Sequence, residues 1–328
     1  MKLKRFAALF AGIAILCCVG CNYDTFMLKD LFPGEATPTE ATATDAPTTV
    51  TTTEEPTTLK TYDFSQLKYS VNSSALACYD VRENRYLYEK NTLVKISPAS
   101  LTKIVTAGVA LKYADPSAVF TVGDEIKFAK SNSSMCFILK GHQVTLYDLL
   151  CGMLMASGND AAYTVAVNVA RSVSGSALND AEAVGCFVGL MNSYAAEIGL
   201  TGSHFVNPEG WDDPEQYMTL QDIVTAALAA MANDTFREIV GKQTYDARFV
   251  SGQTITWKNS NLMLDPASPF YLEGVNGIKT GTTEFAKRCL IASYEDADRQ
   301  LIVASMGNTT DEERYYSVRE MIDTVRSQ

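Results

Sequence analysis

A threonine-rich segment near the N-terminus restricts which part of this 328-residue chain can fold. Residues 36–59 contain eleven threonines, with prolines and glutamates between them. A segment of this composition cannot bury enough apolar surface to offset the entropy that is lost on ordering it. We therefore expect residues 21–60 to form a disordered tether, although a flexible tail without a specific role would have the same composition. The folded domain is then expected to occupy residues 61–328.

Residues 1–20 have the pattern of an export signal. Basic residues at positions 2, 4 and 5 precede an apolar stretch at 6–19, which is too short to span a membrane. This stretch leads into Cys18-Val19-Gly20-Cys21, which resembles a bacterial lipobox, where a small residue precedes a cysteine that is lipidated after cleavage. We predict that residues 1–20 are a signal peptide and that a lipid on Cys21 anchors the protein to the outer face of the cell membrane. An ordinary secretory signal or an uncleaved anchor would also place the rest of the chain outside the cytoplasm.

The overall charge and the low histidine content exclude several classes of function. A net charge of −11 argues against nucleic-acid binding. The chain has two histidines, His142 and His204, and we predict neither a metal centre nor another cofactor. With two histidines in the chain, few residues are available to act as the base of a Ser-His-Asp triad. A hydrolase with this sequence would therefore need another residue type to transfer protons.

Hydrophobic patterning predicts both strands and helices. Runs that alternate or are continuously apolar predict strands, and a polar turn at 82–84 joins the first two into a β-hairpin. The predicted strands lie at 74–80, 85–88, 275–278, 288–294 and 300–306, and the last two form a second hairpin. Longer apolar runs at 104–113 and 147–156 predict helices.

The first candidate for chemistry is Ser100, which is followed three residues later by Lys103. Pro98 and the apolar run after it predict a helix that begins near Ser100, so the two side chains would share one helical face. A serine hydroxyl is a weak nucleophile until a base accepts its proton, and a buried lysine beside other cations can be neutral near pH 7. The pair therefore indicates a serine nucleophile with a lysine base, although an N-cap serine and a surface lysine can have the same spacing.

Two further polar motifs follow in the chain. Residues 157–160 (SGND) lie between two apolar helical stretches, where a hydroxyl and an amide can point into a cleft or can simply form an N-cap turn. Residues 279–282 (KTGT) continue a predicted strand. The glycine lets a substrate backbone lie close to that strand, and the lysine and threonines offer a charge and hydroxyl groups to a carboxylate.

These three motifs occur in this order in penicillin-binding proteins and class A β-lactamases. Longer strings around them resemble the serine-type D-alanyl-D-alanine carboxypeptidases, which are low-molecular-mass penicillin-binding proteins of peptidase family S11. The strings are SLTKIVTA at 100–107, LLCGMLMASGNDAA at 149–162, FVNPEG at 205–210, YMTLQDI at 217–223 and GVNGIKTGTT at 274–283. The resemblance covers residues 62–326. It implies an α+β fold, in which helices flank an antiparallel sheet and a mainly helical subdomain lies within residues 114–270.

The resemblance also implies an activity in cell wall biogenesis and a role for each motif residue. Such an enzyme removes the terminal D-alanine from peptidoglycan stem pentapeptides, and β-lactams acylate the same serine as covalent inhibitors. Ser100 would be the nucleophile, Lys103 the general base, and Ser157 a relay that passes a proton to the leaving group. The substrate-binding residues would be Asn159, Lys279, Thr280, Gly281 and Thr282.

Two positions depart from the family pattern and leave alternatives open. The family often has histidine where this chain has Glu209, and it commonly has Ala-Gly where this chain has Ala286-Lys287. A class A β-lactamase needs a glutamate that activates the deacylating water, and Glu209 lies in the appropriate interval, although its neighbours do not match the expected pattern. A sensor that is acylated by muropeptides or β-lactams without turnover is a further alternative.

Overall fold

The computed structural model describes residues 59–328. The predicted signal peptide, Cys21 and the tether up to residue 58 lie outside the described residues. Within residues 59–328, no helix combines the length and the apolar character that are needed to cross a membrane.

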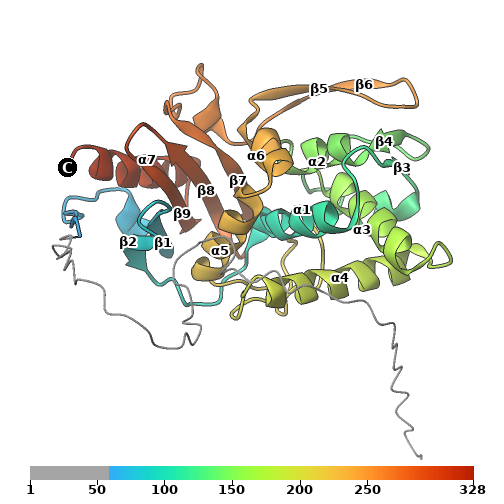
Figure 1. Ribbon diagram of the computed structural model, residues 1–328, viewed down its shortest axis with the longest axis horizontal. Coiled ribbons are helices and arrows are strands. Elements are labelled where there is room, and N and C mark those ends of the chain that lie inside the picture. The colour runs from blue at the N-terminus through green and yellow to red at the C-terminus, as the bar shows by residue number, and fades with distance from the viewer. Residues whose placement is uncertain (1–58) are drawn as a thin grey trace, which may run out of the picture. The chain divides into compact units, whose positions relative to one another are not determined.

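A five-stranded antiparallel sheet organises one end of this region (Figure 1). Its strand order is β2-β1-β9-β8-β7, so the first hairpin of the region pairs with its last strands. Where β1 pairs with β9, Cys78 of β1 lies opposite Val303 of β9. The strands are β1 (Ala75–Asp80), β2 (Arg85–Lys90), β7 (Val275–Thr283), β8 (Lys287–Glu295) and β9 (Gln300–Asn308). The predicted antiparallel sheet and both predicted hairpins are confirmed.

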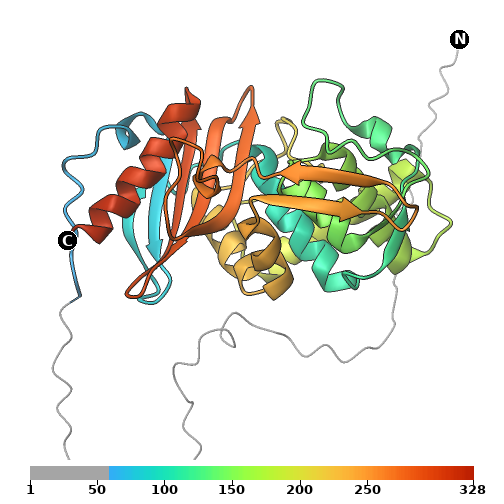
Figure 2. The ribbon, with the colours of Figure 1, turned by 90° about the horizontal axis from the view of Figure 1, so that it is seen from above.

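Helices cover both faces of the sheet (Figure 2). The last helix, α7, packs on one face, where Tyr315 and Ile322 are buried in one cluster with Leu290. On the other face α5 lies against β1 and β9, and α6 lies beside β7. Because both faces are covered, β8 and β9 are buried almost throughout and do not alternate between apolar and polar residues.

The other helices pack around α3, which contacts α1, α2 and α4. Nearly all of the first eleven residues of α3 are buried, which is typical of a helix in the centre of a bundle. The helices are α1 (Thr102–Tyr113), α2 (Leu146–Leu154), α3 (Asn159–Ser174), α4 (Asp180–Glu197), α5 (Leu220–Met231), α6 (Asp234–Gly241) and α7 (Asp311–Arg326). Together with the sheet, they confirm the predicted α+β class.

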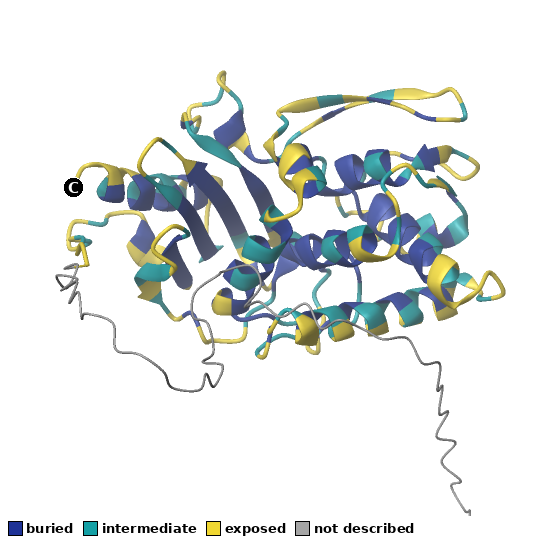
Figure 3. Ribbon diagram, viewed as in Figure 1, coloured by how far each residue is buried: buried dark blue, intermediate teal, exposed yellow. Residues whose placement is uncertain are grey.

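Two small hairpins lie at the helical end. One joins β3 (Val119–Thr121) to β4 (Gln143–Thr145), and the other joins β5 (Thr244–Arg248) to β6 (Thr254–Lys258). Figure 3 shows that burial is concentrated in the sheet and the central helices, whereas the β5–β6 hairpin is largely exposed. The hairpin is held at Trp257, which is buried and donates a hydrogen bond from Nε1 to the main-chain oxygen of Cys136 over 2.9 Å.

Candidate active site

The predicted nucleophile lies in a tight turn that leads into α1. Residues Ala99–Leu101 form a 3-10 turn, and α1 begins at Thr102. Ala99 is buried with a positive φ of 47°, and Ser100 after it is half-buried. Lys103 Nζ donates a hydrogen bond to Ser100 Oγ over 2.9 Å. The structure therefore brings the predicted nucleophile and the predicted base into direct contact.

Lys103 is completely buried, and its ammonium nitrogen is surrounded by oxygen atoms. Besides Ser100 Oγ, it donates to Asn159 Oδ1 over 2.6 Å and to the main-chain oxygen of Glu209 over 2.7 Å. Burial lowers the pKa of Lys103 from 10.5 to about 8, and the carboxylates of Glu209 and Asp160 oppose this shift. A substantial fraction of the lysine is therefore neutral near pH 8 and able to accept the proton of Ser100.

The second motif forms the entry to α3. Asn159 is the first residue of α3, and Ser157, two residues before it, is buried with a positive φ of 62°. The buried carboxylate of Asp160 accepts hydrogen bonds from the N–H groups of Cys136 over 3.0 Å and Ile138 over 3.2 Å. This carboxylate therefore ties the loop that precedes β4 to the start of α3, which fixes the position of Asn159.

The third motif lies on β7, the strand at one edge of the sheet. A Cβ atom added to Gly281 would lie 3.0 Å from Ala99 Cβ and 3.3 Å from the main-chain nitrogen of Ser100. Both distances are tighter than ordinary van der Waals contact, so glycine is what allows β7 to approach the nucleophile turn so closely.

The other residues of this motif bring charge and hydroxyl groups to the same edge. Lys279 is buried, and its pKa lies well below 10.5 because of burial and the nearby positive charges of Lys103 and Arg314. Thr280 Oγ1 shares a hydrogen bond with Ser260 Oγ over 2.7 Å. Because the charges of Lys103 and Arg314 act on Lys279, the three cationic side chains belong to one site.

Arg314 is a site residue that the sequence reasoning missed. It lies on α7, is 8% exposed, and donates from Nη1 to Gly281 O over 3.3 Å and to Thr282 Oγ1 over 3.2 Å. Its guanidinium group thus adds a fixed positive charge beside the threonines that are predicted to bind a carboxylate. No local sequence signal marks it, because it belongs to an ordinary helix that begins after the last strand.

The loop from Asn207 to Asp212 also contacts the site, and only its first part, in the string at 205–210, was predicted, as part of the family resemblance. One carboxylate oxygen of Asp212 accepts hydrogen bonds from Ser97 Oγ and Thr283 Oγ1, each over 2.6 Å. The same loop brings the main chain of Glu209 to Lys103. Of the two positions that depart from the family pattern, position 209 therefore lies in the site, because the main-chain oxygen of Glu209 contacts Lys103.

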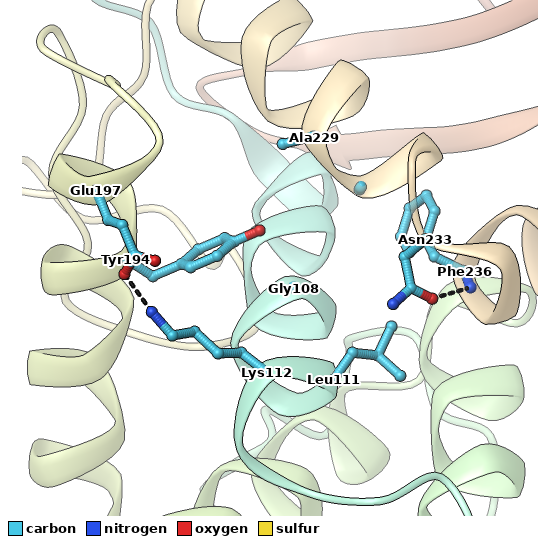
Figure 4. A pocket seen from close by; sticks show the side chains of 9 residues that line it. Gly108, Leu111, Lys112, Tyr194, Glu197, Ala229, Asn233 and Phe236 are labelled. Carbon is cyan, nitrogen blue, oxygen red and sulfur yellow. Dashed lines mark hydrogen bonds and ion pairs between the residues drawn. The ribbon is translucent and has the colours of Figure 1, made fainter. Parts of the chain in front are cut away.

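A separate pocket of about 270 Å³ lies between α1, α4, α5 and α6 (Figure 4). The ring of Tyr194 packs against Gly108, where a Cβ atom would lie 2.8 Å from the ring. The charges at the pocket are already paired, since Lys112 contacts the carboxylate of Glu197. None of the predicted site residues lines this pocket.

Comparison with known proteins agrees with this arrangement. The family model described as D-alanyl-D-alanine carboxypeptidase, peptidase S11, matches residues 61–310. The structure is similar to the crystal structure of the Streptomyces K15 DD-transpeptidase, with a TM-score of 0.71 and 29% sequence identity. That match covers 78% of this chain and 98% of the other.

Curated relatives carry the same family name. D-alanyl-D-alanine carboxypeptidase DacF of Bacillus subtilis (strain 168) is 30% identical, and the match covers 80% of this chain but 64% of that protein. D-alanyl-D-alanine carboxypeptidase DacC of Escherichia coli (strain K12) is 33% identical, with 77% of this chain and 61% of that protein covered. The chain thus spans somewhat less than two thirds of the length of these two relatives. With a family model matched over most of its length and the three motifs assembled around Ser100, the chain belongs to the peptidase S11 family of D-alanyl-D-alanine carboxypeptidases.

Proposed function

We propose that the protein is a serine-type D-Ala-D-Ala carboxypeptidase that removes the terminal D-alanine from peptidoglycan stem pentapeptides. The observation that supports this proposal most strongly is the 2.9 Å contact between Lys103 Nζ and Ser100 Oγ. The lysine in that contact is buried and has a pKa of about 8, so it is a suitable base for a serine nucleophile near neutral pH. β-Lactams are expected to acylate the same serine.

In the acylation step, Ser100 Oγ would attack the carbonyl carbon of the penultimate D-alanine while Lys103 takes the serine proton. The developing oxyanion would be bound by the main-chain N–H groups of Ser100 and Thr282. The close approach of β7 to the nucleophile turn at Gly281 supports this pairing of donors. Removing one such donor in other enzymes costs about 3–4 kcal/mol of transition-state stabilisation.

Departure of the terminal D-alanine requires a proton on its nitrogen. Ser157 would relay to this nitrogen the proton that Lys103 took from Ser100, assisted by Lys279, and Asn159 would hold both Lys103 and the substrate backbone. The free carboxylate of the leaving residue would bind at Thr280 and Thr282. Arg314, which donates to Thr282 Oγ1, would provide positive charge for that carboxylate together with Lys279, and water would then hydrolyse the ester on Ser100.

Labelling with a fluorescent penicillin tests the nucleophile. We expect the wild-type protein to be labelled and Ser100→Ala to be unlabelled. Ser193→Ala is a matched control, because Ser193 is an exposed serine on α4. Labelling of Ser100→Ala at the wild-type rate would contradict the assignment.

Incubation with a pentapeptide muropeptide, read by mass spectrometry, tests the reaction. Loss of one alanine supports the carboxypeptidase. Stable acylation without product would instead support a sensor, and rapid hydrolysis of nitrocefin would support a β-lactamase. Adding an amine acceptor to the same assay separates hydrolysis from transfer, which is relevant because the similar Streptomyces K15 structure is named a DD-transpeptidase.

We also propose that the protein is exported as a lipoprotein and faces the cell wall. The proposal depends on the basic and apolar residues before Cys21 and on the threonine-rich composition of residues 36–59. Mass spectrometry of the mature N-terminus should show a lipid on Cys21. An unmodified N-terminus produced by cleavage elsewhere would refute the anchor.

A further inference from the structure

The turn that carries Glu209 is firmly attached to the start of α1. Asn207 Oδ1 accepts hydrogen bonds from the N–H groups of Gly210 over 2.7 Å and Trp211 over 3.2 Å. Thr106 Oγ1 on α1 donates to the main-chain oxygen of Pro208 over 2.6 Å. These hydrogen bonds fix the turn against α1, so the main chain of Glu209 and its side-chain carboxylate both have defined positions relative to that helix.

The two ends of Glu209 have different roles. Its main-chain oxygen accepts from Lys103 Nζ over 2.7 Å. The residue is 2% exposed, and its carboxylate Oε1 accepts a hydrogen bond from the Tyr163 hydroxyl over 3.1 Å. Within residues 59–328, Oε2 has no hydrogen-bond partner. A buried carboxylate with one unpaired oxygen is unfavourable for the fold, and such a group is commonly explained by a functional role.

The charged and titratable groups around Lys103 come from four parts of the chain. The turn contributes Glu209, α3 contributes Asp160, the loop before β4 contributes Cys136, and β7 contributes Lys279. The first three favour the charged form of Lys103, and the charge of Lys103 in turn lowers the pKa of Lys279 through repulsion between like charges.

Glu209 differs from Asp160 in how its negative charge is used. The Asp160 carboxylate is engaged by main-chain N–H groups, including those of Cys136 and Ile138. The Glu209 carboxylate accepts no main-chain N–H in the described part of the chain. Burial raises its own pKa, and the charges of Lys103 and Lys130 and the side chains of Tyr163 and Asn159 oppose that rise. Glu209 is therefore the less compensated of the two carboxylates that act on the lysine.

We propose that Glu209 is a positioning residue that acts through Lys103: its main-chain oxygen directs the ammonium group toward Ser100, and its buried carboxylate favours the protonated form of the lysine. This inference rests on the proposed function, in which Lys103 must lose its proton before Ser100 can attack. The position at which the family often has histidine thus sets the pH range in which this enzyme is acylated.

The test is the pH dependence of acylation by a fluorescent penicillin in Glu209→Gln, with each rate expressed relative to its plateau at high pH. Removing the negative charge makes the neutral lysine more favourable. We expect the midpoint of the profile to move to lower pH by about one unit, so that relative acylation well below the midpoint rises roughly tenfold. Glu215→Gln is the matched control, because Glu215 is exposed in the same loop and should leave the midpoint unchanged.

A second variant separates charge from shape. Glu209→Asp retains the negative charge and should keep the midpoint close to the wild-type value, even if a shorter side chain lowers stability. If Glu209→Gln does not fold, Glu209→His takes its place, because histidine is largely neutral above pH 7 and should raise relative acylation between pH 7 and 8. A midpoint that is the same in wild type and in the neutral variant would overturn the inference.

Failure of this inference can be distinguished from failure of the proposed function. If wild-type protein is not labelled through Ser100, the proposed function is wrong. If labelling depends on Ser100 but the midpoint does not respond to the charge at position 209, only the role of Glu209 is wrong.

Discussion

At the scale of single residues, the most consequential group is the buried amine of Lys103. Its pKa is lowered from 10.5 to about 8, chiefly by burial. Only the neutral form can accept the serine proton, so acylation by penicillin should fall as the pH decreases below about 8, approaching a tenfold loss per pH unit. Stopped-flow measurement of the labelling rate over a range of about four pH units that includes this midpoint gives the pH profile of acylation.

Replacing this lysine by arginine provides the corresponding control. Lys103→Arg keeps a positive charge beside Ser100 but cannot lose its proton at any pH of the experiment. Acylation should therefore fall by at least about a hundredfold, the lower end of what a general base contributes. A variant that is still acylated at the wild-type rate would show that Lys103 is not the base.

Gly210 is a second residue at which local geometry decides the outcome. Its φ is +89°, and an added Cβ atom would lie 1.8 Å from the main-chain oxygen of Ala99. We expect Gly210→Ala to lower the free energy of unfolding by about 3–5 kcal/mol, measured by urea denaturation. Gly185→Ala is the matched control: Gly185 lies within α4, and no atom of residues 59–328 lies within 4 Å of its added Cβ apart from its own helix backbone. That variant should be stabilised by about 0.5–1 kcal/mol, so destabilisation of both would contradict the steric explanation.

At the scale of secondary-structure elements, Asp160 connects the loop before β4 to α3. Its carboxylate accepts from the N–H groups of Cys136 and Ile138, and both residues are buried. Asp160→Ala leaves these donors unpaired, so the free energy of unfolding should fall by about 2–4 kcal/mol. Because Asn159 is adjacent, the rate of penicillin acylation should fall as well. Asp323→Ala, an exposed position on α7, should change neither quantity appreciably.

At the scale of the whole molecule, the start and the end of the described region are joined. Asp63 N donates to Gln328 Oε1 over 2.8 Å, and Ser70 Oγ donates to Glu320 Oε2 over 2.9 Å. A protein that begins at residue 59 should retain its melting temperature to within about 2 °C and should retain penicillin labelling, because residues 59–328 contain both buried clusters and every motif.

Removing residues 1–68 should lower the free energy of unfolding by about 2–4 kcal/mol, since it deletes partly buried Tyr62, Phe64 and Leu67. Calorimetry of both truncated proteins checks this, and equal melting temperatures would contradict it.

The sequence predicted what depends on short-range order. The five strands of the large sheet were predictable because apolar runs bounded by polar turns indicate them, whereas the four short strands β3 to β6 were not predicted. Helix α1 was predictable from the apolar run after Pro98. Ser100 and Lys103 were predictable as partners because three-residue spacing on a helical turn places both side chains on one side.

The partners that only the tertiary structure revealed come from distant parts of the chain. Arg314 reaches Thr282 across 32 positions, and the main-chain oxygen of Glu209 reaches Lys103 across 106. A main-chain oxygen carries no residue-specific signal, and an arginine on an amphipathic helix resembles any solvated charge. The amino-acid sequence by itself thus determined the reactive groups and their local geometry. The tertiary structure decided their protonation and their charge partners, because burial and electrostatic interaction depend on which distant segments are packed around them.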